Sequence, residues 1–146
     1  RDADLSSSSL VVQHDATGEW DGGLRDVLPL VDVVILNELE FEHCAGGTPR
    51  YFAETCPGTL CIVTRGKNGA VAYRGGEEIA RQASRSVEPL DPTGAGDAFA
   101  AGFLHGCQGD YASMESIRRG LQWGCAMGGA VVMIRGASIP ATTEQI

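Results

Sequence analysis

A short loop that leads into an apolar helical stretch carries the strongest chemical signal in this chain. Residues 91–97 read Asp-Pro-Thr-Gly-Ala-Gly-Asp, and the small and apolar stretch Ala98–Leu104 follows at once. Gly94 and Gly96 can adopt backbone angles that are closed to other residues, so several N–H groups can turn toward one anion. The positive end of the helix dipole lies at the same point. The loop therefore predicts an anion site at a helix N-terminus.

Asp97 occupies the first turn of this predicted helix, where its carboxylate would repel a bound phosphate. Its position makes chemical sense if it accepts the proton of a hydroxyl group that attacks the phosphate. We therefore predict a general base beside an anion hole, an arrangement suited to phosphoryl transfer. The alternative is an ordinary strand-to-helix turn in which Asp97 complements the helix N-terminus, and the loop taken alone does not separate the two.

Two common nucleotide-binding fingerprints do not fit the chain. The dinucleotide pattern G-x-G-x-x-G/A, placed on Gly94 and Gly96, requires a small residue where Phe99 stands. A Walker loop would need a glycine where Cys61 stands, and Asn68 occupies the place of its Ser or Thr. Phosphate binding must therefore be sought in another type of site.

Composition bounds the class of protein. The chain has 146 residues, of which 43% are hydrophobic and 21% charged, as expected for one soluble globular domain. A net charge of −8 disfavours binding to nucleic acid or to an anionic membrane, and the longest apolar run, near 130–134, is too short to cross a bilayer. Five cysteines without a C-x-x-C pair and three scattered histidines indicate no metal cluster and predict a reducing, cytoplasmic location.

The hydrophobic pattern predicts strands that alternate with helices. Continuous apolar runs indicate buried strands at 10–13, 32–36 and 60–64, and the segments 70–73 and 77–80 indicate a hairpin. We expect helices at 22–30, at 48–56, from the 94–97 turn to about 106, and at 114–134. Thr48 and Pro49 are predicted as the N-cap and first-turn proline of the second helix. This pattern is typical of an α/β domain with a mostly parallel sheet flanked by helices.

Polar motifs follow the carboxyl ends of the predicted strands. They are Asn37-Glu38-Leu39-Glu40, Thr64-Arg65-Gly66 and the loop 91–97. Ligands of open parallel sheets bind beyond these strand ends. We therefore expect the three motifs to converge at one edge of the sheet.

Together these motifs resemble the ribokinase-like carbohydrate kinases, the PfkB family. The family's D-x-x-G-A-G-D signature matches Asp91–Asp97, its N-x-x-E matches Asn37 and Glu40, and its T-x-G matches Thr64 and Gly66, all in the family's order. The resemblance covers nearly the whole chain. It implies a ribokinase-like fold and ATP-dependent phosphorylation of a hydroxyl group on a sugar or a sugar-containing small molecule, such as a nucleoside.

The resemblance implies the roles of the loop residues. Asp97 would be the general base, and the backbone amides of Gly94, Ala95 and Gly96 would hold the transferring phosphoryl group. Asp91, with residues 135–138, matches the place where many members bind a monovalent cation such as potassium. These expectations assign the chemistry to one short segment.

The resemblance also implies that Glu40, assisted by Asn37, holds water ligands of the magnesium ion that neutralises the triphosphate. The competing interpretations are a helix cap for Asn37 and a solvated helix face for Glu40.

Four residues are expected on the nucleotide side. Thr64 and Gly66 would line the phosphates and ribose. Cys125 stands where family members often have Asn or His near the adenine, and Gly128 fits a wall of small residues that admits a flat base. Helix packing explains Gly128 equally well.

Members of this family are about twice as long as this chain. We therefore interpret residues 1–146 as the C-terminal, nucleotide-binding portion of such a kinase, without the N-terminal half that carries the lid and sugar site. We expect the 146-residue chain alone to be inactive, the full-length protein to bind a small sugar or nucleoside, and a homodimer to be one of its assemblies. The alternatives are a non-catalytic nucleotide-binding or interaction module and, less favoured by the Asn37–Glu40 pattern, a vitamin kinase of related fold.

Overall fold

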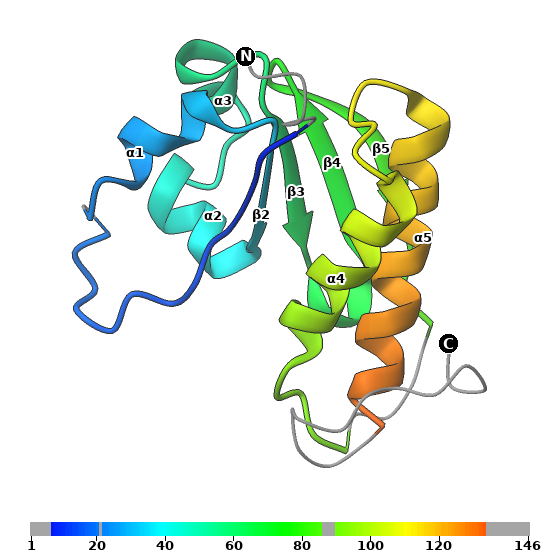
Figure 1. Cartoon of the computed structure of the whole chain (residues 1–146). Helices are drawn as coiled ribbons and strands as arrows, with labels where there is room; N and C mark the ends of the chain where they lie inside the picture. Colours follow the sequence, from blue (N-terminus) through cyan, green and yellow to red (C-terminus); the bar gives the residue numbers. More distant parts are fainter. Residues whose placement is uncertain (1–6, 21, 86–89, 134–146) are drawn as a thin grey trace. The chain divides into compact units, whose positions relative to one another are not determined.

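The computed structural model describes residues 7–20, 22–85 and 90–133 (Figure 1). The chain divides into two compact units. Unit 1 contains Arg1–Thr64 and Val71–Ala80, and unit 2 contains Arg65–Ala70 and Arg81–Ile146.

Five strands form one mixed sheet, in the order in which they occur along the chain. They are β1 (Ser9–Val11), β2 (Val33–Asn37), β3 (Leu60–Thr64), β4 (Ala70–Arg74) and β5 (Glu77–Gln82). β1 pairs with β2 and β2 with β3 in parallel, and this register places Asn37 opposite Thr64. The two-residue connection between β4 and β5, Gly75-Gly76, is a hairpin turn with positive φ at both glycines. The predicted α/β class and the predicted strands are confirmed, within one to two residues at their ends.

Four short helical segments complete unit 1. They are α1 (Leu24–Val27), the 3-10 turn η1 (Leu28–Leu30), α2 (Glu38–Ala45) and α3 (Arg50–Thr55). The helix predicted at 22–30 is interrupted because Pro29 lies in the first turn of η1, where it has no backbone N–H to donate. The predicted cap at Thr48 is wrong, since Pro49 holds the N-cap position of α3 and no side chain caps that helix. Helix α2 was not among the predicted helices, although a helix cap was one interpretation of Asn37.

The core of unit 1 joins one face of β2 and β3 to the helices. It includes Val34, Leu36, Cys61 and Val63 from the strands and Leu28, Phe41, Cys44 and Phe52 from the helical segments. The Phe41 and Phe52 rings stack with centroids 6.0 Å apart, which ties α2 to α3. Figure 1 shows α2 beginning at the carboxyl end of β2. Burial of Phe41 therefore fixes the first turn of α2 beside the polar ends of two strands.

Unit 2 is built around an antiparallel pair of helices, α4 (Ala95–Cys107) and α5 (Met114–Val131) (Figure 1). Their backbones approach closely because glycines face each other along the contact. A Cβ atom on Gly106 would lie 2.8 Å from the Arg119 carbonyl oxygen, and one on Gly124 would lie 2.8 Å from the Phe99 ring. Helix α5 ends at Val131, three residues before the predicted 134, and residue 134 lies outside the described residues.

A hydrogen-bonded turn connects the two helices. Asp110 Oδ1 accepts from the backbone N–H groups of Ala112 and Ser113, both at 3.0 Å, and Asp110 Oδ2 accepts from the Ser116 hydroxyl at 3.0 Å. The Ser113 side chain caps α5 by accepting from the Ser116 N–H at 3.2 Å. Hydrogen bonds from the Ser113 and Ala112 amides lower the pKa of Asp110 below its ordinary value.

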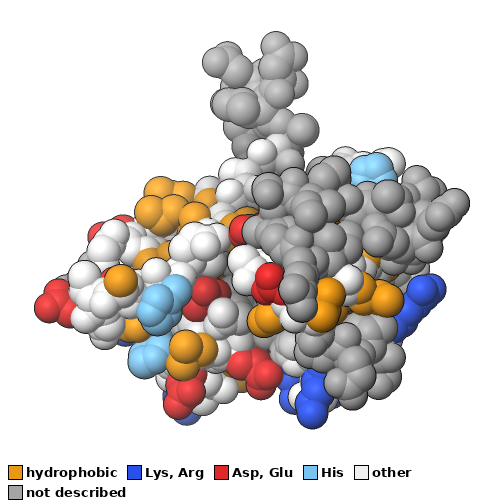
Figure 2. Space-filling model, turned by 90° about the horizontal axis from the view of Figure 1, so that it is seen from below, with side chains coloured by type: hydrophobic (Ala, Val, Ile, Leu, Met, Phe, Trp, Pro, Cys, Tyr) orange, Lys and Arg blue, Asp and Glu red, His pale blue; other side chains and the backbone are white. Residues whose placement is uncertain are grey.

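Figure 2 shows acidic side chains scattered over one face and basic side chains toward its edges. Within the three described ranges, no helix combines the length and apolar character that a membrane span requires.

Candidate functional site

The junction between β2 and α2 is a reciprocal capping box. Asn37 is both the last residue of β2 and the N-cap of α2, and its Oδ1 accepts from the Glu40 N–H at 2.8 Å. In return Glu40 Oε2 accepts from the Asn37 N–H at 2.8 Å. The helix-cap interpretation of Asn37 is therefore confirmed, and the N-x-x-E motif has a structural role whatever its chemistry.

Glu40 is not on a solvated face. The residue is only 6% exposed, which removes that alternative. Burial raises the pKa of Glu40, while the Asn37 N–H and the charge of His14 act in the opposite direction. The capping box engages Oε2 alone, and Oε1 makes no hydrogen bond to any residue in the described ranges. One carboxylate oxygen therefore remains as an acceptor at the carboxyl end of β2.

The Glu40 Oε1 atom suits a magnesium ion that is held through its water ligands rather than by direct bonds to protein side chains. Across the part of the chain that the structure describes, no three His, Cys, Asp or Glu side chains gather closely enough to hold a metal ion. Magnesium keeps several waters and commonly uses one or two carboxylates together with substrate phosphates. A single carboxylate oxygen beside a strand end fits that mode.

The T-x-G motif begins in unit 1 and continues in unit 2. Thr64 ends β3 directly opposite Asn37, so the structure brings together Asn37, Glu40 and Thr64. Gly66 lies in unit 2, has φ +53° and opens a 3-10 turn that Gly69 closes through its N–H to the Gly66 carbonyl oxygen at 3.1 Å. The motif thus has a rigid strand end followed by a tight turn.

The loop before α4 has the geometry of an open helix N-terminus. Asp91 Oδ1 accepts from the Thr93 N–H at 2.9 Å, and the Leu90 and Asp91 N–H groups donate to the Val132 carbonyl oxygen at 2.8 and 3.1 Å. Gly94 is the N-cap, with φ +80° and no side-chain cap. Hydrogen bonds therefore hold the start of the loop in place. Its end, at the N-terminus of α4, has no side-chain cap.

The amides of this loop differ in what they bind. The Ala95 N–H donates to the Pro92 carbonyl oxygen at 3.2 Å, whereas the Gly94 and Gly96 N–H groups have no acceptor in the described ranges. Unpaired amides at a helix start are donors for an anion. Backbone angles closed to other residues were expected at both glycines. Gly94 has such a conformation, with positive φ, whereas Gly96 has ordinary helical geometry as the second residue of α4. A Cβ on Gly96 would meet no atom within 4 Å.

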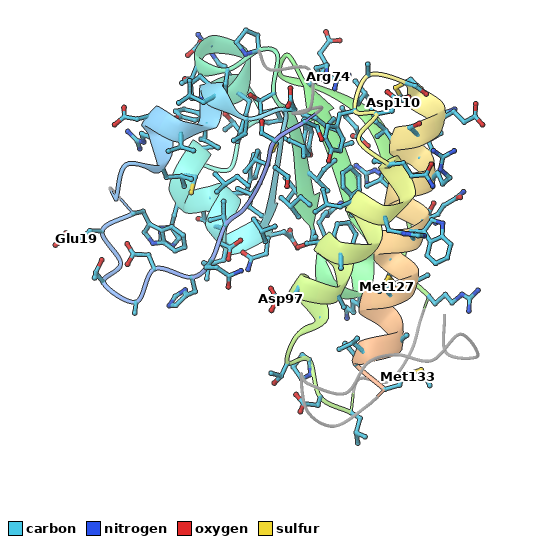
Figure 3. All side chains as sticks on the ribbon, viewed as in Figure 1. Glu19, Arg74, Asp97, Asp110, Met127 and Met133 are labelled. Carbon is cyan, nitrogen blue, oxygen red and sulfur yellow. The ribbon has the colours of Figure 1, made fainter. Side chains whose placement is uncertain are left out.

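Asp97 is the third residue of α4, and it is exposed. It lies two residues before Phe99, whose ring packs on Gly124 of α5, so helical spacing places Asp97 on the opposite side of α4. Figure 3 shows its carboxylate projecting from the first turn of α4 away from α5. The predicted base is therefore accessible next to the uncapped amides.

Gly128 packs against the start of α4. A Cβ on Gly128 would lie 3.2 Å from the Ala95 carbonyl oxygen and 3.5 Å from Phe99 Cβ, so close helix packing alone explains this glycine. Residues 135–138, the second part of the expected cation site, lie outside the described residues.

Cys125 lines a cavity of about 660 Å³ in unit 2. Residues 82, 83 and 85, at and after the end of β5, form one part of its wall, and residues 122, 123, 125 and 126 of α5 form another. Burial raises the pKa of the Cys125 thiol to about 11. Trp123 and Gln82 were not predicted as part of any site, and the sequence holds no clear signal for them: Trp123 stands two residues before Cys125, a spacing that does not bring side chains together on a helix.

A mixed five-stranded sheet flanked by helices, with polar motifs at the ends of its parallel strands, is a ribokinase-like fold, of which this chain contains a part. The chain belongs to the pfkB family of carbohydrate kinases, whose family model matches residues 6–144.

The proteins similar to this chain include ones named as sugar kinases and one named as a nucleoside kinase. A fructokinase of Escherichia coli is 35% identical over 131 residues, covering 83% of this chain and 42% of that protein. A cytidine kinase of Thermococcus kodakarensis is 35% identical over 104 residues, covering 68% of this chain and 37% of that protein. A putative ribokinase II of E. coli, solved in complex with ATP and Mg²⁺, is 30% identical with a TM-score of 0.64, covering 82% of this chain and 38% of that chain. The chain thus spans about two fifths of the length of these relatives.

Proposed function

We propose that the full-length protein containing this chain is an ATP-dependent kinase that phosphorylates a hydroxyl group of a sugar or a sugar-containing small molecule. The observation that carries the proposal is the start of α4, where an exposed Asp97 follows the amides of Gly94 and Gly96, which have no acceptor in the described ranges. Family membership and the sugar and nucleoside kinases among its relatives support it.

In this proposal Asp97 accepts the proton of the acceptor hydroxyl as its oxygen bonds to the γ-phosphorus of ATP. The bond from that phosphorus to the bridging oxygen breaks, and ADP leaves. The amides of Gly94 and Gly96 donate to the oxygens of the transferring group, and the N-terminal end of α4 adds positive potential. The Ala95 amide is proposed to belong to the same anion hole. To donate to the phosphoryl group, it must first break its hydrogen bond to the Pro92 carbonyl oxygen.

Glu40 is proposed to orient water ligands of magnesium through Oε1, with its other oxygen held by the capping box. Magnesium, when bound, supplies the charge that neutralises the triphosphate. Asn37 acts through Glu40, since its side chain is occupied in capping α2. We further propose that Asp91 contributes to a monovalent-cation site, most simply for potassium.

For the nucleotide we propose that Thr64 and Gly66 contact phosphates and ribose and that Cys125 and Gly128 border the base. The support is the polar strand end at Thr64, the tight turn at Gly66 and the cavity beside Cys125.

The deciding experiment is a transfer assay with the full-length protein, radiolabelled ATP, magnesium and a panel of sugars and nucleosides. The proposal predicts a labelled phosphate ester of at least one acceptor. Binding of ATP without transfer to any of them would instead support a non-catalytic nucleotide-binding module.

A further inference from the structure

One carboxylate shapes the loop that follows β1. Asp15 Oδ1 accepts from the Thr17 N–H at 2.8 Å and from the Thr17 hydroxyl at 2.7 Å, and Asp15 Oδ2 accepts from the Trp20 N–H at 2.7 Å. The Gly18 N–H donates to the Asp15 carbonyl oxygen at 3.1 Å, which closes a turn. These hydrogen bonds hold residues 15–20 in one conformation.

Trp20 has an unusual backbone conformation for a large residue. Its φ of +54° lies in the left-handed region, which glycine adopts freely and bulky residues rarely adopt. Within the described ranges the other non-glycine residue with positive φ is Gln108, and it is the C-cap of α4, where this conformation is common. Such conformations cost free energy and persist where the surrounding structure requires them. The contacts of the Trp20 indole show what this strained conformation achieves.

The Trp20 indole joins the loop to α2. It is stacked on the His43 imidazole, with ring centroids 4.9 Å apart and planes 4° from parallel. The His14 imidazole lies nearly perpendicular to the indole, with centroids 5.9 Å apart. His43 is in the last turn of α2, and Figure 1 shows the chain after β1, in blue, passing beside that helix. One large ring therefore bridges the end of β1 and α2, both in unit 1.

The stack lies on the side of α2 that carries Glu40. Glu40 and His43 are three residues apart on the helix, a spacing that places side chains on the same side. Burial raises the pKa of Glu40 and the charge of His14 opposes this effect, which also indicates that the loop lies near the carboxylate. Phe41, two residues before His43, is buried in the core on the opposite side of α2. The helix is therefore held between Phe41 and Trp20.

We propose that Trp20 is a positioning residue for magnesium, because its stack on His43 fixes the rotation of α2 and thereby the direction in which Glu40 Oε1 meets metal-bound water. The inference rests on the proposed function. Glu40 moves with α2, since its Oε2 is tied to the Asn37 N–H in the capping box. Loss of a group that orients a metal site commonly lowers metal affinity by roughly tenfold or more. Trp20 acts one step further away, so we expect a smaller effect.

The test measures how strongly magnesium improves ATP binding to the full-length protein in the absence of an acceptor. Isothermal titration calorimetry in magnesium and in EDTA gives two dissociation constants, and their ratio is the readout. Trp20→Gly should lower this ratio by about threefold to tenfold and leave the affinity in EDTA nearly unchanged. Because glycine adopts positive φ without strain, this variant removes the ring without straining the loop. Trp20→Phe should restore most of the ratio, since an aromatic ring remains.

A double variant tests whether the effect passes through the stack. His43→Ala should lower the ratio as much as Trp20→Gly does, and the two changes together should cause no further loss, because both remove the same contact. His105→Ala is the matched control and should leave the ratio unchanged. His105 also contacts a tryptophan ring, Trp123, with centroids 4.9 Å apart, but it belongs to α4 in unit 2. Additive losses in the double variant would contradict the inference.

The outcomes separate the inference from the proposed function. A ratio that falls in Glu40→Gln but not in Trp20→Gly would overturn the inference and leave the proposed function intact. A wild-type ratio of one would defeat both, because magnesium would then not act with ATP at this site. The expected ratios without phosphate transfer to any sugar or nucleoside would support the role of Trp20 and defeat the proposed kinase activity.

Discussion

Glu40 combines a structural and a proposed chemical role in one carboxylate. Oε2 closes the capping box with Asn37, and Oε1 is the atom that we assign to magnesium-bound water. Because the residue is only 6% exposed, a change of charge there is felt strongly. The two roles can be separated, since a Gln side chain also completes a capping box.

Glu40→Gln in the full-length protein should raise the magnesium concentration needed for half-maximal rate by about tenfold or more, because a neutral amide orients metal-bound water less well. The melting temperature should change little. Glu38→Gln is the matched control, since Glu38 is exposed in the same first turn of α2. An unchanged magnesium dependence in Glu40→Gln would leave Glu40 with its capping role alone.

Asp110 makes the stability of the α4–α5 turn depend on pH. Its pKa is lowered in the folded state by the amides of Ser113 and Ala112 and by the Ser116 hydroxyl, below a reference value of 3.8. A depressed folded pKa stabilises the protein at pH values above the unfolded pKa, and this stabilisation disappears as pH falls through the folded pKa.

Asp110→Asn should therefore lower the melting temperature at neutral pH, and the gap from wild type should close below about pH 4. Glu115→Gln, an exposed acidic change in the first turn of α5, serves as the control. A gap that stays constant down to pH 2 would show that the carboxylate charge does not contribute.

At the scale of elements, α4 and α5 form a pair whose spacing is set by glycine. Gly106 lies where a Cβ would be 2.8 Å from both the Arg119 carbonyl oxygen and Gly120 Cα. Backbone atoms cannot swing aside as a flexible side chain can. The distance between the helices is therefore fixed near the C-terminal end of α4.

Gly106→Ala should destabilise the protein by about 1–3 kcal/mol, a typical cost of overpacking. Gly129→Ala is the matched control, because Gly129 is also helical and a Cβ there would meet no atom within 4 Å. Equal free energies of unfolding for the two variants, measured with urea, would contradict the close-packing account.

The elements themselves were largely predictable, because unbroken apolar runs and turn residues identify buried strands and their ends. Helix α2 was missed because the N-x-x-E motif was interpreted for its chemistry, although the same spacing is the signature of a capping box. The position of Asp97 in the first turn of α4 and the uncapped helix start at Gly94 followed from the loop sequence. The cavity at Trp123 could not be predicted from the sequence, because its wall combines residues about 40 positions apart that only the folded chain brings together.

At the scale of the molecule, the chain has features expected of a part of a larger protein. β1 lies at one end of the strand order, and among the described strands it pairs with β2 alone. Beside it lies a mostly apolar cavity of about 360 Å³, lined in part by Leu10, Trp20 and Val27. Leu30, close by in sequence, is 77% exposed. We propose that the remaining three fifths of a relative's length supplies a cover for this region.

The isolated 146-residue chain should then self-associate, bind ATP weakly and transfer no phosphate, because an open strand edge and exposed apolar side chains favour association. Sedimentation velocity and the transfer assay measure these properties. A stable monomer that phosphorylates a sugar would show that residues 1–146 are a complete small kinase.

The central claim, that Asp97 is the base for phosphoryl transfer, is tested most directly by single-turnover kinetics of Asp97→Asn in the full-length protein. Glu115→Gln is the control, since it removes a carboxylate from the first turn of the neighbouring helix. We predict that Asp97→Asn lowers the rate of transfer by about a hundredfold or more while the affinity for ATP stays nearly unchanged, because the base acts in the transition state. A rate within about tenfold of wild type would contradict the account.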